Sequence, residues 1–330
     1  MKNWLSMLFG VLGVGVMGTG HSAVQGPFLY QLQNADPAAI AASGFKVVVM
    51  DPTRHGDEAS RYSRSEIVNL VQKGISPIAY FSIGEAEDYR GYWQKNWVSK
   101  AGSNLFTPQA PGWLGLTNPD WAGNYKVRYW ESDWRYTVLE PELKKIIAQG
   151  FKGVYLDIVD AFEYWGDPNS YGHADDKEKR QLNDPLDRKE SAKSMIDLIR
   201  WIADVGRELG GPDFMVVPQN AEYILAYDHR GVYMDAIAGI GVEDVWYDEE
   251  QKRSAQELGW RMPHLRQLVG AGKFVLSVDY VDNGDYDDPA NRQRIHDYLE
   301  QCRREGFLGY VSPTDRELDE IHTIEKIQPR

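Results

Sequence analysis

Cysteine is almost missing from this chain of 330 residues, in which Cys302 is the only one. A disulfide within the chain is therefore impossible, and no partner pattern around Cys302 indicates a nucleophile or a metal ligand. The residue falls in the last turns of a predicted amphipathic helix, where we expect it to fill the core. Burial of apolar surface alone must hold the fold together, and the chain is long enough for this.

Positive charge is also scarce, because 36 Lys and Arg stand against 49 Asp and Glu, and no basic cluster stands out. Nucleic acids and anionic membranes both require a positively charged footprint, so neither is an expected partner. A neutral or cationic ligand suits this charge better. We expect the protein to act as a monomer.

The common motifs of cofactor and nucleophile chemistry are missing. No Gly-x-Gly-x-x-Gly follows the first predicted strand, and the chain contains neither a P-loop nor a Gly-x-Ser-x-Gly elbow. The seven His residues show no His-x-His or His-Glu-x-x-His spacing. We therefore expect no cofactor and no metal, while a hydrolase that holds a metal through carboxylates stays open as an alternative.

Long apolar runs are confined to the N-terminus. Lys2 precedes an apolar stretch from Trp4 to Met17, and small residues follow as far as Ala23. This order is typical of a secretory signal peptide, so we predict a signal over residues 1–23 and a secreted or periplasmic domain over 24–330. A retained membrane anchor is the alternative, which the short, Gly-rich apolar stretch disfavours.

The rest of the chain alternates strand-like segments with helix-like ones. The pattern predicts eight strands, over residues 28–33, 46–50, 78–82, 153–156, 214–218, 236–241, 274–278 and 308–311. The predicted helices include one that opens with the capping box Ser63–Glu66 and others near 36, 133–149, 190–209, 254–271 and 290–305. This rhythm predicts an α/β fold, a single-domain (β/α)₈ TIM barrel.

Carboxylates stand where these strands end. The apolar run from Gly153 stops at Asp157, and other strand exits carry Asp51, Glu85, Glu87, Asp88, Asp160, Glu222, Glu243, Asp244 and Asp279. In a barrel these ends converge on one mouth, where barrel enzymes place their chemistry. Like charges at one mouth raise some pKa values and leave other groups ionised, and glycoside hydrolysis requires such a pair. A helix cap or loop hydrogen bond is the more common role for any single one of these acids.

Two long loops follow the third and fourth predicted strands, over residues 89–129 and 161–189. The first holds Trp93, Trp97, Trp113 and Trp121, and the second carries a charged run around 175–180. Long ordered loops are often functional, and their aromatic faces could stack on sugar rings. Ordinary packing is the alternative for the aromatic residues, and solvent-exposed decoration is the alternative for the charged run.

The segment from Ala79 to Arg90, Ala-Tyr-Phe-Ser-Ile-Gly-Glu-Ala-Glu-Asp-Tyr-Arg, is the longest of six that resemble glycoside hydrolase family 114. The other segments are 30–36, 43–49, 155–160, 218–222 and 241–244, in the same order along nearly the whole mature chain. The resemblance implies a secreted TIM-barrel endo-α-1,4-polygalactosaminidase that cuts α-1,4-linked galactosamine, a cationic polymer of microbial exopolysaccharide and biofilm. An acidic mouth suits such a polymer because carboxylates attract its ammonium groups.

The resemblance also implies roles for individual residues. Asp157 is expected to be the nucleophile and Glu222 the acid/base of a retaining, two-carboxylate glycosidase, with Glu243 as the alternative acid/base. The residues expected to face the substrate or support the site are Asp51, Tyr80, Glu85, Glu87, Asp160, Asn220, Glu243, Tyr247 and Asp279. A barrel that binds carbohydrate without turnover, in the handling of exopolysaccharide, is the alternative function.

Overall fold

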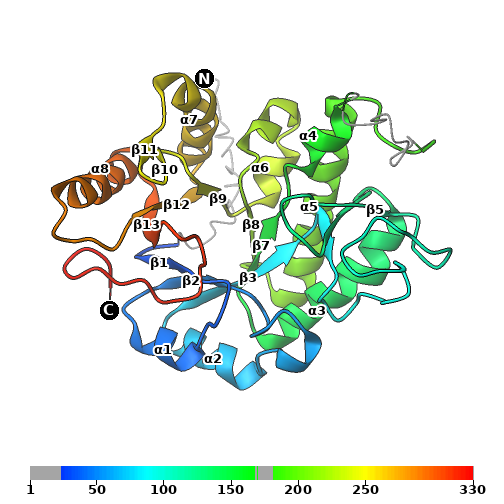
Figure 1. The fold of residues 1–330 in the computed structure, drawn as a ribbon, viewed down its shortest axis with the longest axis horizontal. Helices are drawn as coiled ribbons and strands as arrows, with labels where there is room; N and C mark the ends of the chain where they lie inside the picture. Colours follow the sequence, from blue (N-terminus) through cyan, green and yellow to red (C-terminus); the bar gives the residue numbers. More distant parts are fainter. Residues whose placement is uncertain (1–23, 168, 170–180, 330) are drawn as a thin grey trace, which may run out of the picture.

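Eight strands surround the centre of the molecule and helices cover the outside, as the computed structural model shows (Figure 1). The structure describes residues 24–167, 169 and 181–329. The barrel strands are β1 Phe28–Tyr30, β2 Val47–Met50, β3 Ser76–Ser82, β7 Gly153–Asp157, β8 Met215–Pro218, β9 Gly239–Glu243, β12 Phe274–Asp282 and β13 Leu308–Pro313. The α/β barrel expected from the sequence is confirmed, and each predicted strand overlaps an observed one.

The strands form two parallel sheets, in the orders β1-β2-β3-β7-β8 and β13-β12-β9. One parallel bridge between Gln219 and Gly241 joins them, and the amide of Ala238 donates to the carbonyl of Val216 over 2.8 Å. The sheets are therefore continuous across β8 and β9, and the strand ends face one mouth.

The C-terminal tail bonds to β13 and to the residues that follow β1, two strands that are not paired with each other in the described sheets. The side chain of Gln328 accepts from the amide of Val311 (2.9 Å) and donates to its carbonyl (3.0 Å). At the mouth, the amides of Leu32 and Gln33 both donate to the carbonyl of Leu318. The tail thus satisfies backbone groups that strand pairing would otherwise use.

Helices follow the strands, and all of them except α4 and α6 overlap a helix that the sequence predicts. They are α1 Pro37–Ala42, α2 Arg64–Gln72, α3 Glu140–Gln149, α4 Ala161–Gly166, α5 Arg188–Gly210, α6 Val232–Ala236, α7 Ala255–Gly270 and α8 Pro289–Glu305. Ser63 and Glu66 form the predicted capping box of α2. A π-helix, Trp134–Leu139, precedes α3 where one continuous helix was expected, and short 3-10 turns span Glu58–Ser60 and Glu222–Tyr227.

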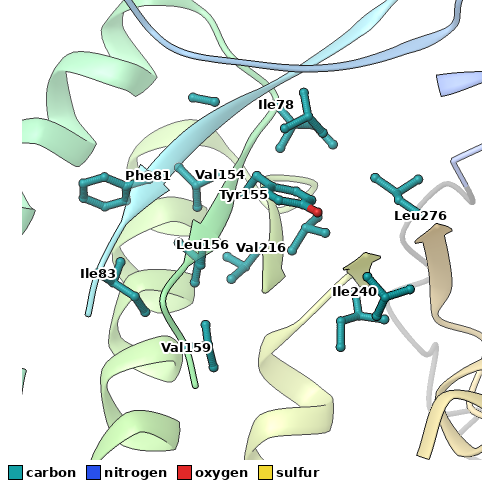
Figure 2. Packing of buried hydrophobic residues seen from close by; sticks show 14 of the residues in the cluster. Ile78, Phe81, Ile83, Val154, Tyr155, Leu156, Val159, Val216, Ile240 and Leu276 are labelled. Carbon is teal, nitrogen blue, oxygen red and sulfur yellow. The ribbon is translucent and has the colours of Figure 1, made fainter. Parts of the chain in front are cut away.

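Apolar side chains from every barrel strand fill the interior. Figure 2 shows Tyr155 of β7 among Ile78, Val216, Ile240 and Leu276, which come from four other strands. Gly241 lies so close to this ring that an added Cβ would sit 1.9 Å from the Tyr155 hydroxyl oxygen. The barrel is therefore a filled core, and ligand chemistry is confined to its mouth.

The loop of residues 89–129 has its own aromatic core. It includes part of a small antiparallel sheet of β4 Glu85–Glu87, β5 Leu114–Thr117 and β6 Asn124–Val127. Trp97 lies edge-on to Trp113 with ring centroids 5.3 Å apart, and Trp113 contacts Trp134 at 4.7 Å. These three indoles are buried, so they hold the loop on the barrel. Trp121 of the same loop differs from these indoles, because 66% of its surface is exposed.

The predicted signal peptide, residues 1–23, lies outside the described residues, as do residues 168 and 170–180 of the second loop. Within the part that the structure describes, no helix has the length and apolar character needed to cross a membrane.

Candidate active site

The backbone is strained at the three strand exits that hold the candidate carboxylates. Ile158, Asn220 and Asp244 have φ values of 59°, 53° and 51°, in the left-handed region. The first follows Asp157, the second follows β8 and the third follows Glu243. A β-branched residue such as Ile158 adopts this conformation rarely, and such strain collects at functional sites.

Asp157 ends β7 and is held by two hydrogen bonds. The Tyr80 hydroxyl donates to its Oδ2 over 2.6 Å, and the strained amide of Ile158 donates to its Oδ1 over 2.8 Å. Burial raises the pKa of Asp157 to about 7, although both hydrogen bonds act to lower it. The side chain is thus a carboxyl group poised between its two proton states near neutral pH.

Glu243 ends β9 and is held in the same way. Its Oε1 accepts from Tyr280 over 2.5 Å and its Oε2 accepts from Gln219 over 2.6 Å. Its amide donates to the Oδ1 of Asn220 over 3.0 Å. Burial raises the pKa of Glu243, and the charge of Asp244 raises it further. A raised pKa favours the protonated form that a general acid needs.

The charges of Asp157 and Glu243 interact with each other. The charge of Glu243 is one of the factors that raise the pKa of Asp157, after burial. Tyr155, at the centre of the barrel, has a pKa raised by burial first and then by the charges of Glu243 and Asp157. Both carboxylates therefore act on one ring below the mouth, and ionisation of one disfavours ionisation of the other.

Glu222 occupies a different environment. It begins the 3-10 turn after β8, it is fully buried, and its Oε1 accepts from Arg261 of α7 over 2.5 Å. The same guanidinium donates to the carbonyls of Glu243 and Asp244. Glu222 therefore fixes an arginine that holds the backbone of Glu243.

Asp51 and Glu87, both expected at the site, share Arg90. The guanidinium donates to both oxygens of Asp51 (3.0 and 2.7 Å) and to Oε2 of Glu87 (2.7 Å). It also lies 5.9 Å from the centre of the Tyr80 ring. These residues form a support for Tyr80, and through it for Asp157.

Three other predicted site residues face the protein interior. Asp279 is fully buried and accepts backbone hydrogen bonds from residues 245–247, all between 2.8 and 2.9 Å. Tyr247 is buried and donates to Asp297, and Glu85 accepts from Asn118 and Asn124. Their surroundings are those of structural residues, because these hydrogen bonds fix loops beneath the mouth. A carboxylate at a strand exit can serve the fold as well as the site, and the sequence alone does not distinguish the two.

A cleft of about 490 Å³ opens beside Glu243. Its walls come from the exits of β7, β8 and β9 and from α7, and include the predicted residues Asp160 and Asn220. Trp260 of α7, 65% exposed, forms part of one wall. Among the described residues, no three His, Cys, Asp or Glu side chains are grouped so as to hold a metal ion.

Tyr80 and Asn220, which hold Asp157 and Glu243, were among the predicted site residues. The other residues that hold the carboxylates were missed because their type gives no signal in the sequence. Gln219 precedes Asn220 in the segment 218–222, and Tyr280 directly follows Asp279. The one signal in the sequence for Gln219 and Tyr280 was therefore their position next to a predicted site residue. Arg90 and Arg261 act through partners distant in sequence, which only the fold brings together.

An α/β barrel with two carboxyl groups of raised pKa at its mouth, one of which, Glu243, lines an open cleft, is consistent with a barrel glycoside hydrolase. The chain belongs to glycoside hydrolase family 114, whose model matches residues 18–328, and it is a glycoside hydrolase. It is also 40% identical over 302 residues to an uncharacterized protein of Thermotoga maritima, covering 92% of this chain and 85% of that protein. An uncharacterized protein of Methanocaldococcus jannaschii, MJ1477, is 41% identical over 294 residues, with 89% and 77% covered.

Solved structures share the fold at low sequence identity. The glycoside hydrolase domain of PelA from Pseudomonas aeruginosa is 17% identical with a TM-score of 0.61, covering 92% of this chain and 98% of that domain. Ega3 of Aspergillus fumigatus, solved in complex with galactosamine, is 15% identical with a TM-score of 0.58, covering 93% and 98%.

Proposed function

We propose that this protein is a retaining endo-glycosidase that cleaves α-1,4-linked, galactosamine-rich polysaccharide. The proposal depends on one observation: at the barrel mouth burial raises the pKa of Asp157, and the charge of Glu243 raises it further. A tyrosine hydroxyl donates a hydrogen bond to each of these two carboxylates. Membership of family 114 and the galactosamine bound to the similar Ega3 structure support the choice of substrate.

In this mechanism Asp157 is the nucleophile and Glu243 the acid/base, in place of the Glu222 that was expected from sequence. The ionised Asp157 attacks the anomeric carbon as the glycosidic C–O bond breaks, and protonated Glu243 gives its proton to the leaving oxygen. Glu243 then takes a proton from water, whose oxygen displaces Asp157 and restores the starting anomeric configuration. Mutual repulsion favours this mixed state, with one carboxyl charged and the other neutral.

The neighbouring side chains keep the pair in these roles. Tyr80 and the Ile158 amide orient Asp157, while Gln219, Tyr280 and Asn220 orient Glu243. The Glu222–Arg261 pair fixes the backbone of Glu243. Rigid support of this kind preserves the geometry that catalysis requires.

We also propose that residues 1–23 direct secretion, that the mature domain 24–330 acts as a monomer, and that its substrate is a microbial exopolysaccharide. The formal charge of −13 supports a cationic polymer as substrate, because the protein attracts ammonium groups at long range.

The test is hydrolysis of defined galactosamine oligomers by Asp157→Asn, Glu243→Gln and Glu222→Gln variants, with NMR analysis of the first-formed anomer. We expect the first two changes to reduce kcat by at least about 10³-fold, since each removes a group that reacts, and the wild-type product to retain the α configuration. Glu222→Gln should keep more activity than Glu243→Gln. The opposite order would return the acid/base role to Glu222.

The products distinguish this proposal from the alternatives. Internal cleavage gives a ladder of short oligomers, whereas release of one sugar at a time would contradict the endo mode. Saturable binding of the polymer without new reducing ends would support a binding barrel without turnover.

A further inference from the structure

The cleft beside Glu243 continues into a second one. A cleft of about 460 Å³ lies between α4, the 3-10 turn Glu222–Tyr227 and α7. Glu163, Tyr223 and Trp260 line both clefts. The two clefts therefore adjoin at these three residues, and we treat them as one groove that leads from Glu243 past Trp260 to His264.

Trp260 is an exposed aromatic side chain on the wall of this groove. It projects from the surface of α7 with 65% of its area accessible, although most of the large aromatic side chains in the structure are buried. Indole faces bind the apolar faces of rings, and an exposed one in a polar groove offers a surface for a ligand. Trp260 on α7 therefore offers such a surface in addition to the exposed Trp121 of the loop of residues 89–129.

Two carboxylates in the groove are free to meet a cation. Glu222 and Asp244 are paired with Arg261 and Arg316, and Glu257 accepts from Ser254 and Arg253. By contrast, neither Asp160 nor Glu163 forms an ion pair among the described residues, and the hydrogen bond found for the Asp160 carboxylate comes from its own backbone amide. Burial raises the pKa of both groups. The charge of Glu222 raises the pKa of Asp160 further, and the charge of Arg188 offsets only part of the rise at Glu163.

A further observation points to a ligand at the same place. Glu222 is fully buried in the wall of the cleft, and its Oε2 has no hydrogen-bond partner among the described residues. A buried carboxylate oxygen without a partner is costly, and a donor that enters the cleft would relieve this cost.

We propose that the groove from Glu243 to His264 is a binding site for a second amino sugar, in which Trp260 stacks on the ring and Asp160 and Glu163 bind its ammonium group. The inference rests on the proposed function and deepens it, since it assigns selection for the free amine over the N-acetylated sugar to residues outside the catalytic pair. Binding energy from such a remote ring also accelerates the cleavage of long substrates more than that of short ones.

Calorimetry on the inactive Asp157→Asn form tests the stacking surface without any turnover. Adding Trp260→Ala should weaken the binding of galactosamine oligomers about tenfold, the size expected for one lost ring contact. Trp121→Ala is the matched control, because Trp121 is equally exposed but lines neither cleft. Equal affinities for the two double variants, or no binding of the oligomers by Asp157→Asn, would overturn the site.

The carboxylates are tested by the ratio of affinities for galactosamine and N-acetylgalactosamine oligomers. Asp160→Asn and Glu163→Gln should each lower this ratio several-fold and reduce its dependence on salt, because a charge pair is removed. An unchanged ratio in both variants would refute the amine contact. If the wild type binds with these properties but releases no reducing ends, the binding site stands and the proposed hydrolysis fails. If the wild type hydrolyses the oligomers but Trp260→Ala binds them as the wild type does, the proposed hydrolysis stands and the second binding site fails.

Discussion

At the scale of single residues, the site depends on two carboxyl groups that the fold keeps partly protonated. Asp157 has a pKa raised to about 7 by burial, and the pKa of Glu243 is raised by burial and by Asp244. Tyr80 and Tyr280 each give one of these carboxylates a short hydrogen bond, and burial keeps both phenols protonated by raising their pKa values. Each carboxylate is thus held by a donor that stays neutral.

The first residue-scale prediction concerns the pH dependence of activity. Because Asp157 must be ionised, kcat/KM should fall as pH drops below about 7, and because Glu243 must be protonated, it should fall again at alkaline pH. Glu243→Gln should remove the alkaline limb. The measurement uses a galactosamine oligomer, whose leaving oxygen needs the acid, with enough enzyme to follow the residual activity of Glu243→Gln. An alkaline limb that persists in Glu243→Gln would contradict the assignment.

The second residue-scale prediction concerns how the stability of the folded protein depends on pH. The pKa of Asp157 is about 7 in the folded state against an ordinary 3.8, so the folded state holds the proton more tightly. Between pH 4 and 7 the unfolded state binds fewer protons at this group, and the free energy of unfolding falls as pH rises. Asp157→Asn should therefore raise the melting temperature by a few degrees at pH 8 and change it little at pH 4.

The exposed Asp120→Asn provides the control, with no change expected at either pH. A melting temperature of Asp157→Asn below that of the wild type at pH 8 would show that the carboxylate stabilises the fold.

At the scale of elements, the loop after β3 fits against the exit of β7 through Gly84. A Cβ on Gly84 would lie 2.1 Å from the carbonyl oxygen of Ile158 and 2.7 Å from its Cγ2. The same strained residue donates its amide to Asp157. The glycine in the segment Ser82–Glu85 is therefore required by the close approach of two strand exits, and this approach helps to position Asp157.

Gly84→Ala should reduce stability by about 1–3 kcal/mol and also reduce kcat, because Ile158 must move. Gly112→Ala is the control, since nothing lies within 4 Å of an added Cβ there. Thermal unfolding and steady-state kinetics measure the two effects. A Gly84→Ala enzyme with wild-type kcat would show that Asp157 is not positioned through Ile158.

The elements with regular apolar patterns could be predicted from the sequence, and those fixed by distant contacts could not. β7 was visible because Gly153–Leu156 is buried on both faces, and α2 because Ser63 and Glu66 cap it. The short helices α4 and α6 have too few residues for a periodic signal. Glu222 and Glu243 look alike in sequence, and only the position of Arg261 on α7 shows which of them is buried in an ion pair.

At the scale of the whole molecule, the C-terminal tail bonds to β13 and to the residues after β1, and it is itself held by His322. Its Nε2 lies 2.8 Å from Oδ2 of Asp282, at the end of β12, and its Nδ1 lies 3.2 Å from Glu320. Burial opposes protonation of His322, but its bonds to Asp282 and Glu320 outweigh this and raise its pKa. Burial also opposes ionisation of Asp282, and its bonds from His322, Asn291 and Tyr286 hold its pKa well below the usual range. At mildly acidic pH the tail is thus fastened by an ion pair.

The stability that this ion pair contributes should depend on pH in a defined way. A histidine whose pKa is raised on folding contributes fully below its ordinary value of 6.5, and the contribution disappears as pH rises through the folded pKa. His322→Gln should therefore lower the melting temperature by several degrees at pH 5 and by much less at pH 9. The exposed His55→Gln should change it at neither pH. Because the tail also bonds to Leu32 and Gln33 beside the mouth, loosening it should reduce activity along with stability. Equal losses of stability at pH 5 and pH 9 would show that His322 acts through packing and that its charge contributes nothing to holding the tail.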